Sequence, residues 1–296
     1  MKISVITWDA SFREKFHTVD TFGNQNYSKD KFEFLWCDFY EANATDLIKK
    51  INTYNNFKIV NLNNAKTTNW HLGKTINMGI KNSKGDILVI PDGDIIVESD
   101  FLNNIEKKFN EINNDNTVIY FRRWDEPENK SCEKSYQLDY LRNNTQLFNP
   151  TNYGGCFAIK RKTFENIGFY EEHKIFSGPG ANGLEQYLRF RNKGLAILWD
   201  NKKIFHPYHS FTGFSDKRSS KLKEAEKQIP WLNSYNGLEQ SWVIKSREIL
   251  LDWKANDGSI DKYLRNIPSI DELILVKKNK ISSFKKLFKK LIRKIK

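Results

Sequence analysis

Two short segments of the sequence carry side chains whose types and spacing suit metal binding. Asp92-Gly93-Asp94 places two carboxylates on either side of a glycine, which lets the backbone turn and approach a ligand closely. His206-Pro207-Tyr208-His209 holds two imidazoles, which are common metal ligands. Carboxylate and imidazole ligation, completed by phosphate oxygens of a substrate, suits Mn²⁺ or Mg²⁺. These segments therefore predict a divalent-cation site.

A third segment suits acid–base chemistry. Gly178–Glu185 is rich in glycine and opens a predicted helix with an acid in its first turn. Glu185 can act there as a general base, or it can only complement the positive end of the helix dipole. The metal segments have structural alternatives as well. An Asp-x-Asp occurs by chance about once in a chain of this composition and can be a solvated turn, and the histidine pair can be one buried and one exposed residue.

The elements that must position these residues alternate in type along the first third of the chain. Apolar runs at residues 3–8, 31–38, 57–62 and 86–91 predict strands, and amphipathic patterns at 46–55 and 72–82 predict helices. Ile87–Ile90 is a run of four apolar residues without alternation, which indicates a strand buried on both faces. This order predicts an α/β fold with a mostly parallel sheet flanked by helices. Asp92-Gly93-Asp94 then lies in the crevice at the carboxyl ends of the strands.

Beyond residue 100 the pattern is less regular. It predicts helices at 101–109, 161–167 and 184–191, strands at 118–122, 195–199 and 203–205, and a polar loop at 143–155. Two more helices, at 219–228 and 238–253, predict a C-terminal helical extension. We therefore divide the chain into a domain at 1–215, with halves at 1–100 and 101–215, an extension at 216–276 and a tail at 277–296.

Composition narrows the class of protein. Of the 296 residues, 39% are hydrophobic and 14% aromatic, which is enough for a sizeable core and excludes a wholly disordered chain. The three cysteines are odd in number and far apart, which argues against a disulfide framework and for a reducing compartment. The N-terminus does not have the pattern of a signal peptide, and no apolar run reaches the roughly 18 residues that span a bilayer.

The net charge of +12 comes almost entirely from the tail. Residues 277–296 hold ten Lys or Arg and no acids, which leaves 38 basic and 36 acidic residues in the rest of the chain. Because the body is nearly neutral, we expect no nucleic-acid partner. Apolar residues from Ile281 to Ile295 recur at helical spacing in the tail, which predicts a basic amphipathic helix on an anionic membrane surface. A solvated tail, or one that binds RNA or a protein partner, is the alternative.

The order of the motifs resembles the GT-A glycosyltransferases of family 2, especially bacterial members with a galactosyltransferase-like C-terminal region, such as chondroitin-polymerase-type enzymes. The resemblance runs from Ile3 to about Phe211. It rests on the following segments: Ile3–Thr7, Glu33–Asp38, Trp70–Ile80, Gly85-Asp86, Asp92-Gly93-Asp94, Tyr153–Arg161, Ile167–Glu172 and His206.

The resemblance implies a GT-A fold and assigns roles to individual residues. It places the nucleotide-binding half at 1–100 and the acceptor half at 101–215. It implies a metal held by Asp94 and His206, with His209 as the alternative to His206, and an acceptor side at Gly154 and Gly155. The residues that it implies for binding the nucleotide-sugar are Thr7, Asp38, Lys74, Asn77, Asp92 and Asp94.

One position departs from the family pattern. Where the family has the aspartate that acts as catalytic base, the alignment places Gly183, which cannot accept a proton. Glu185 lies two residues later and is our candidate base, with Glu172 as its substitute. If neither acts, the chain is a catalytically impaired relative that binds nucleotide-sugars or glycans without turnover.

The function that the resemblance implies is metal-dependent, inverting transfer of a sugar from a UDP-sugar. We expect the acceptor to be a glycan or lipid-linked oligosaccharide of a bacterial surface polysaccharide, such as capsule or lipopolysaccharide. With the basic tail, this predicts a cytoplasmic enzyme that is peripheral on the inner face of the cytoplasmic membrane. A sugar nucleotidyltransferase is a different enzyme class with a similar sheet. It would carry a glycine-rich basic loop after the first strand, where this chain has Trp8–Phe12.

Overall fold

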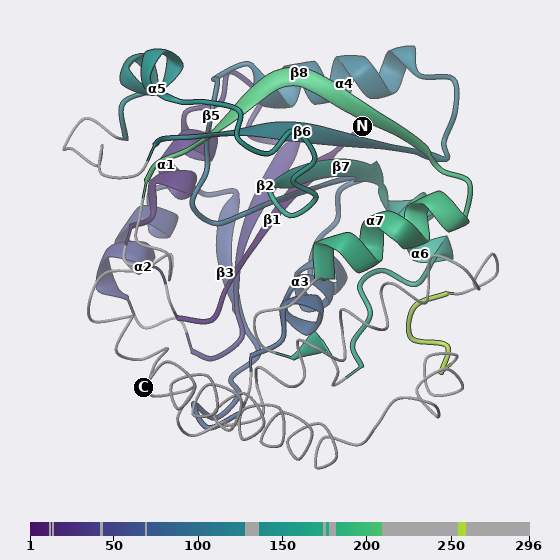
Figure 1. The fold of residues 1–296 in the computed structure, drawn as a ribbon. Coiled ribbons are helices and arrows are strands. Elements are labelled where there is room, and N and C mark those ends of the chain that lie inside the picture. The colour runs from purple at the N-terminus through teal and green to yellow at the C-terminus, as the bar shows by residue number, and fades with distance from the viewer. Residues whose placement is uncertain are drawn as a thin grey trace, which may run out of the picture.

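The computed structural model describes residues 1–208, except positions 12, 14, 42, 43, 69, 128–135, 174, 175 and 178–181, together with residues 254–258. This part of the chain is built around one eight-stranded sheet, ordered β3-β2-β1-β4-β7-β6-β8-β5 and covered by helices on both faces (Figure 1). Apart from residues 254–258, the predicted extension lies outside the described residues, as do the tail and His209.

The first half of the chain forms the parallel part of the sheet. Its strands pair in the order β3, β2, β1, β4, with all three pairings parallel. Each strand is bounded as the apolar runs predict, to within about two residues. The strands and helices are β1 (Ile3–Asp9), α1 (His17–Gly23), β2 (Phe32–Asp38), α2 (Thr45–Asn52), β3 (Phe57–Asn61), α3 (Leu72–Lys81) and β4 (Ile87–Pro91).

The second half makes the sheet mixed. β7 runs antiparallel to both β4 and β6, whereas β6 and β8 are parallel to each other. A two-residue strand, β5, pairs antiparallel with β8 at the far edge. The elements are β5 (Ile96–Val97), α4 (Phe101–Glu111), β6 (Thr117–Asp125), α5 (Leu138–Asn144), β7 (Cys156–Lys160), α6 (Arg161–Asn166), α7 (Asn182–Asn192) and β8 (Ala196–His206).

The core lies on both faces of the sheet. On one face α1, α2 and α4 pack through side chains such as Phe22, Ile51 and Phe101. On the other face α3, α6 and α7 pack through Ile76, Phe164 and Phe190. Since every residue of β1, β2 and β4 is buried or nearly so, apolar side chains are needed at consecutive positions. The predicted α/β fold with a helix-flanked sheet is confirmed.

Two features differ from the sequence expectation. The two late strands predicted at 195–199 and 203–205 are one continuous strand, β8. Its pairing with β6 is irregular between Asp200 and Ile204, where the register shifts, and it resumes at Ile204. The loop predicted at 143–155 overlaps the end of α5. Among the helices of the described residues, none is long and apolar enough to cross a membrane.

Candidate active site

The carboxyl ends of the parallel strands gather acidic side chains at one edge of the sheet. β1 ends with Asp9 and β2 with Asp38, and these two residues are direct partners in the parallel register. β4 ends at Pro91, so Asp92 and Asp94 follow it at the same edge. An open α/β sheet binds its ligands at this edge.

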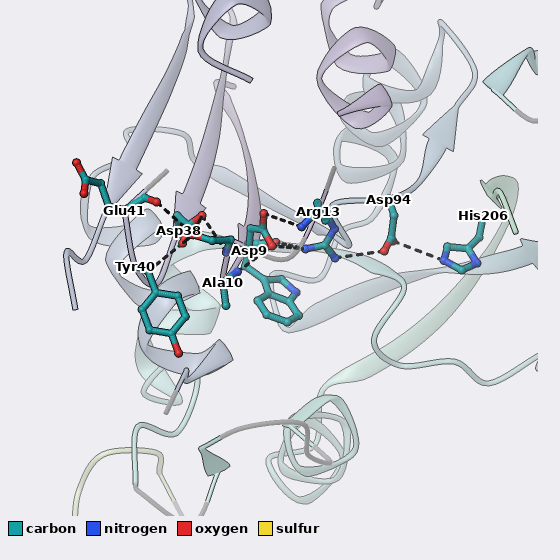
Figure 2. Close-up of polar contacts among 10 residues, drawn as sticks. Asp9, Ala10, Arg13, Asp38, Tyr40, Glu41, Asp94 and His206 are labelled. Carbon is teal, nitrogen blue, oxygen red and sulfur yellow. Dashed lines mark hydrogen bonds and ion pairs between the residues drawn. The ribbon is translucent and has the colours of Figure 1, made fainter. Parts of the chain in front are cut away.

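Asp38 is fixed by backbone groups and faces a second acid. Its Oδ1 accepts a hydrogen bond from the amide of Tyr40 at 2.9 Å, and its Oδ2 accepts one from the amide of Ser11 at 3.1 Å (Figure 2). Burial and then the charge of Asp9 raise the pKa of Asp38 to about 6. This carboxylate is therefore held in one orientation but can be protonated under mildly acidic conditions.

Aromatic rings lie beside Asp38. The rings of Trp8 and Trp70 stack with their centroids 5.1 Å apart. The ring of Trp70 packs on a small apolar cluster that contains Phe39 and Tyr40, which directly follow Asp38. A hydrogen-bonding carboxylate next to flat aromatic rings suits the recognition of a planar, polar group such as a nucleobase.

Asp92 is anchored to the start of β7. Its amide donates to the carbonyl of Gly155 at 2.9 Å, and its carboxylate lies 3.9 Å from Arg123 of β6. Burial and then the charge of Asp94 raise the pKa of Asp92 to about 7. The loop after β4 thus touches Gly155, one of the two glycines predicted for the acceptor side. The other, Gly154, donates its amide to Asn152 Oδ1 at 3.0 Å.

Asp94 and His206 face each other across the sheet edge. Nε2 of His206 lies 3.7 Å from Oδ1 of Asp94, and Nδ1 of His206 lies 2.9 Å from Oδ1 of Asp125. Asp125 is the partner of His206 in the β6–β8 register. A hydrogen bond from Nδ1 to a carboxylate fixes the tautomer and leaves the Nε2 lone pair directed at Asp94, as in many metal-bound histidines.

These two side chains fit a divalent cation. A carboxylate oxygen and an imidazole nitrogen separated by 3.7 Å can both reach an ion with bonds of about 2.0–2.2 Å. Within the described part of the chain, no group of three or more His, Cys, Asp or Glu side chains gathers around a common point. An ion held here would therefore take its remaining ligands from substrate phosphates and water, as Mg²⁺ usually does.

Arg13 is a site residue that the sequence analysis does not predict. It lies in an irregular segment after β1, and its side chain folds back so that Nη1 donates to the carbonyl of Trp8 at 2.7 Å. Its Nη2 lies 3.3 Å from Oδ2 of Asp94, in line with His206 (Figure 2). In the sequence, Arg13 follows Asp9 by four residues, and this spacing of opposite charges is the signal that could have predicted their ion pair at the sheet edge.

The other residues predicted to bind the nucleotide-sugar have different surroundings. Thr7 is fully buried in β1, and within the described residues its hydroxyl makes no hydrogen bond. Lys74 is exposed in the first turn of α3. Asn77 is buried in α3, where its amide donates to the carbonyl of Tyr170 and to Oε1 of Glu172, both at 2.8 Å. Asn77 thus fastens the 170–172 segment to α3.

Glu185, the candidate base, is occupied by an ion pair. Its two carboxylate oxygens accept hydrogen bonds from Nε and Nη2 of Arg189, one helical turn later, at 2.8 and 3.2 Å. Glu185 is 1% exposed and Arg189 also 1%. Burial raises the pKa of Glu185, and the charge of Arg189 opposes that rise. Nη1 of Arg189 also donates to the carbonyl of Ile167 at 2.9 Å, so the pair joins α7 to the end of α6.

Gly183 lies against the predicted acceptor side. A Cβ atom added to Gly183 would be 3.3 Å from the amide nitrogen of Gly154 and from the carbonyl carbon of Tyr153. Both contacts are to backbone, which cannot turn aside as a side chain can. At the position where the resemblance implies a catalytic aspartate, the backbone of Tyr153 and Gly154 therefore approaches closely.

Comparison with known proteins agrees with this fold. The family model of glycosyl transferase family 2 matches residues 38–168. The structure of S. aureus TarS 1–349 is similar with a TM-score of 0.51 and 16% identity, over 92% of this chain and 77% of that one. The same protein in complex with UDP-GlcNAc gives a TM-score of 0.51 and 16% identity, over 83% and 70%.

An archaeal enzyme is similar to the same degree. The mannosyltransferase PcManGT from Pyrobaculum calidifontis, in complex with GDP-Man and Mn²⁺, has a TM-score of 0.50 and 13% identity, over 96% of this chain and 80% of that one. No curated protein matches the sequence significantly. The likeness to these structures shows the GT-A fold, and together with the family-model match it supports a glycosyltransferase. The match to glycosyl transferase family 2 covers residues 38–168, which is less than half of the chain.

Proposed function

We propose that this glycosyltransferase is metal-dependent and inverting, and that it transfers a sugar from a UDP-sugar to a glycan of a bacterial surface polysaccharide. The observation that carries the donor side is the convergence of Asp38, Asp94 and His206 at one edge of the sheet. The complex of S. aureus TarS with UDP-GlcNAc supports the donor class by analogy. The inverting outcome and the acceptor class rest on the motif resemblance alone.

In this proposal each acid of the sheet edge has its own task. Asp38 accepts a hydrogen bond from the nucleobase of the donor, because its carboxylate is oriented by the amides of Ser11 and Tyr40. Asp94 and His206 hold Mn²⁺ or Mg²⁺, which when bound stabilises the charge that develops on the departing diphosphate. Asp92 lies beside Arg123, and its amide is bonded to Gly155 of the predicted acceptor side. Asp92 therefore binds the part of the donor that faces the acceptor.

Glu172 suits the task of the base better than Glu185 does. A base must reach the acceptor hydroxyl and exchange its proton with solvent. Glu172 is half-buried and its carboxylate is oriented by Asn77, whereas Glu185 is enclosed and bonded through both oxygens to Arg189. We therefore assign proton abstraction to Glu172.

Glu172→Gln is expected to lower turnover by at least about 10²-fold, because a general base contributes that much or more. Binding of UDP with Mn²⁺ should remain within about twofold of wild type, which titration calorimetry measures. Glu165→Gln removes an exposed carboxylate on the neighbouring α6 and is the matched control. Full turnover by Glu172→Gln, with loss of turnover in a folded Glu185→Gln variant, would return the role to Glu185.

The raised pKa of Asp38 predicts how nucleotide binding responds to pH. Above a pKa of about 6 the group is an ionised acceptor, and below it the group is protonated. The affinity for UDP should therefore fall about tenfold between pH 7.5 and pH 5, as the ionised fraction falls. Asp38→Asn should bind more weakly at pH 7.5 and lose this part of the pH dependence. An identical pH profile in the two proteins would show that Asp38 does not contact the nucleotide.

The test of the proposed function is calorimetric titration of UDP into the protein with and without Mn²⁺. We expect binding only when Mn²⁺ is present, followed by release of UDP from a UDP-sugar. Binding of UDP without hydrolysis or transfer would favour the non-catalytic relative, which the glycine at position 183 motivates. Binding in neither condition would contradict the proposal for UDP, and GDP would be the next nucleotide to titrate.

A further inference from the structure

The guanidinium of Arg13 is buried among the acids of the sheet edge. Its side chain is only 7% exposed and lies 3.4 Å from Asp9 and 3.3 Å from Asp94. It joins the segment after β1 to the loop after β4 and is next in line to the Asp94–His206 pair (Figure 2). The nearest cation to the carboxylate that we assign to the metal is therefore an arginine of the chain itself.

The surrounding backbone leaves room for this side chain. A Cβ atom added to Gly93 would lie 2.6 Å from Nε of Arg13, so any other residue at the centre of Asp92-Gly93-Asp94 would require the Arg13 side chain to move. Burial would by itself lower the pKa of Arg13, but Asp94, Asp9 and Asp92 together raise it above its ordinary value. Arg13 is therefore charged at every physiological pH.

The contacts of Arg13 are not those of a saturated structural ion pair. Its distances to the two carboxylates are at the long end for charge-assisted hydrogen bonds, which are about 2.7–2.9 Å. Its Nε–H is buried and has no hydrogen-bond acceptor within the described residues. Buried donors are almost always satisfied, and a guanidinium donates in a fixed fork that matches phosphate.

A divalent cation and this guanidinium would share the carboxylate of Asp94, with Arg13 at Oδ2 and the cation at Oδ1 beside His206. Both cations are attracted to the carboxylate of Asp94, and because both lie beside it they repel each other. A diphosphate brings several new oxygen acceptors and more negative charge to the same place. Arg13 can then bind the diphosphate, while a cation held by Asp94 and His206 can also take phosphate oxygens as ligands.

We propose that Arg13 is a diphosphate-binding residue which, before the donor arrives, occupies the carboxylate of Asp94. In this arrangement Arg13 weakens metal binding to the free protein and strengthens binding of the nucleotide with its metal. The donor and the ion are thus expected to bind cooperatively, since each relieves the cost of binding the other. The inference deepens the proposed function and rests on it for the identity of the diphosphate.

The test compares wild type with Arg13→Met, which keeps the apolar stem and removes the charge. Mn²⁺ is titrated without nucleotide, and UDP is titrated at saturating Mn²⁺, both by calorimetry. We expect Arg13→Met to bind Mn²⁺ alone about tenfold more tightly and UDP about tenfold or more weakly, because a hydrogen bond to a charged group contributes about 1.5–3 kcal/mol. Opposite signs in one variant are not the result of partial unfolding, which weakens both.

Arg142→Met is the matched control. It removes one arginine charge from an exposed ion pair with Glu98 and should change neither affinity. If Arg13→Met leaves both affinities unchanged, or weakens both equally in a folded protein, Arg13 only braces the loops and the inference is wrong. If wild type binds no UDP, the proposed function fails. The effect of Arg13 on the metal is tested separately: a gain of Mn²⁺ affinity in Arg13→Met still supports it, and no gain overturns it.

Discussion

Asp94→Asn is expected to lower glycosyl transfer by about a thousandfold and to remove the Mn²⁺ dependence of UDP binding. The amide keeps the shape of the side chain but loses the negative charge beside His206 and Arg13. The negative charge that develops on the leaving diphosphate then lacks the divalent cation that would stabilise it. Removing one such stabilising group typically lowers kcat by about 10²–10³-fold. Calorimetric titration of UDP with and without Mn²⁺, and UDP release from the donor, measure the two effects.

A second variant, with a smaller expected effect, tests the role of His206. Asp125→Asn leaves Asp94 intact but removes the carboxylate that lies 2.9 Å from Nδ1 of His206. Loss of such a supporting partner typically costs about 10–100-fold in metal affinity. Unchanged Mn²⁺ dependence in Asp94→Asn would remove Asp94 from the site. Unchanged metal affinity in Asp125→Asn would show that His206 is not a ligand.

Arg189→Met is expected to destabilise the fold by about 3–5 kcal/mol, the usual cost of breaking a buried ion pair on one side. It leaves the carboxylate of Glu185 enclosed without its cation and removes the bond to the carbonyl of Ile167. Chemical denaturation monitored by tryptophan fluorescence measures the change. An exposed substitution such as Arg191→Met on the same helix should cost less than about 0.5 kcal/mol.

The loss in Arg189→Met should depend on pH with a definite sign. Burial already raises the pKa of Glu185 above its ordinary value, and removing Arg189 takes away the charge that opposes this rise. The folded variant then holds a proton that the unfolded chain has released, so its stability falls as pH rises through the pKa of the folded state. The destabilisation should be larger at pH 8 than at pH 5. A pH-independent loss below about 1 kcal/mol would mean that water reaches Glu185.

The strands that carry the acids could be predicted because their burial imposes a simple pattern. Ile87–Ile90 is apolar at every position since both of its faces are covered, and the first polar residues after it mark the edge of the sheet. Helices α3 and α4 could be predicted for the related reason that each buries one side. In each case the periodicity of the sequence follows from the environment of the element.

The parts that could not be predicted depend on contacts between distant segments. Arg13 lies in an irregular stretch, so no periodicity places its side chain 81 positions away on Asp94. The Glu185–Arg189 spacing of four is visible in the sequence, but such pairs usually lie on exposed helix faces, and only the packing of α7 shows that this one is buried. Glu126, which accepts hydrogen bonds from Tyr140 and from the amide of Tyr208, depends in the same way on the fold.

The short pairing of β5 with β8 has a consequence for how this enzyme can diverge. Only Ile95 separates Asp94 from β5, and His206 directly follows the two residues of β8 that pair with β5. The pairs Ile96–Phe205 and Val97–Ile204 therefore fix the spacing between the side chains of Asp94 and His206. A slip of one residue would displace one of them by about 3.3 Å and reverse its face. Insertions in the loops between β6 and β8 leave this spacing unchanged, whereas the interval from Asp94 to Val97 cannot change length while the two side chains stay in range.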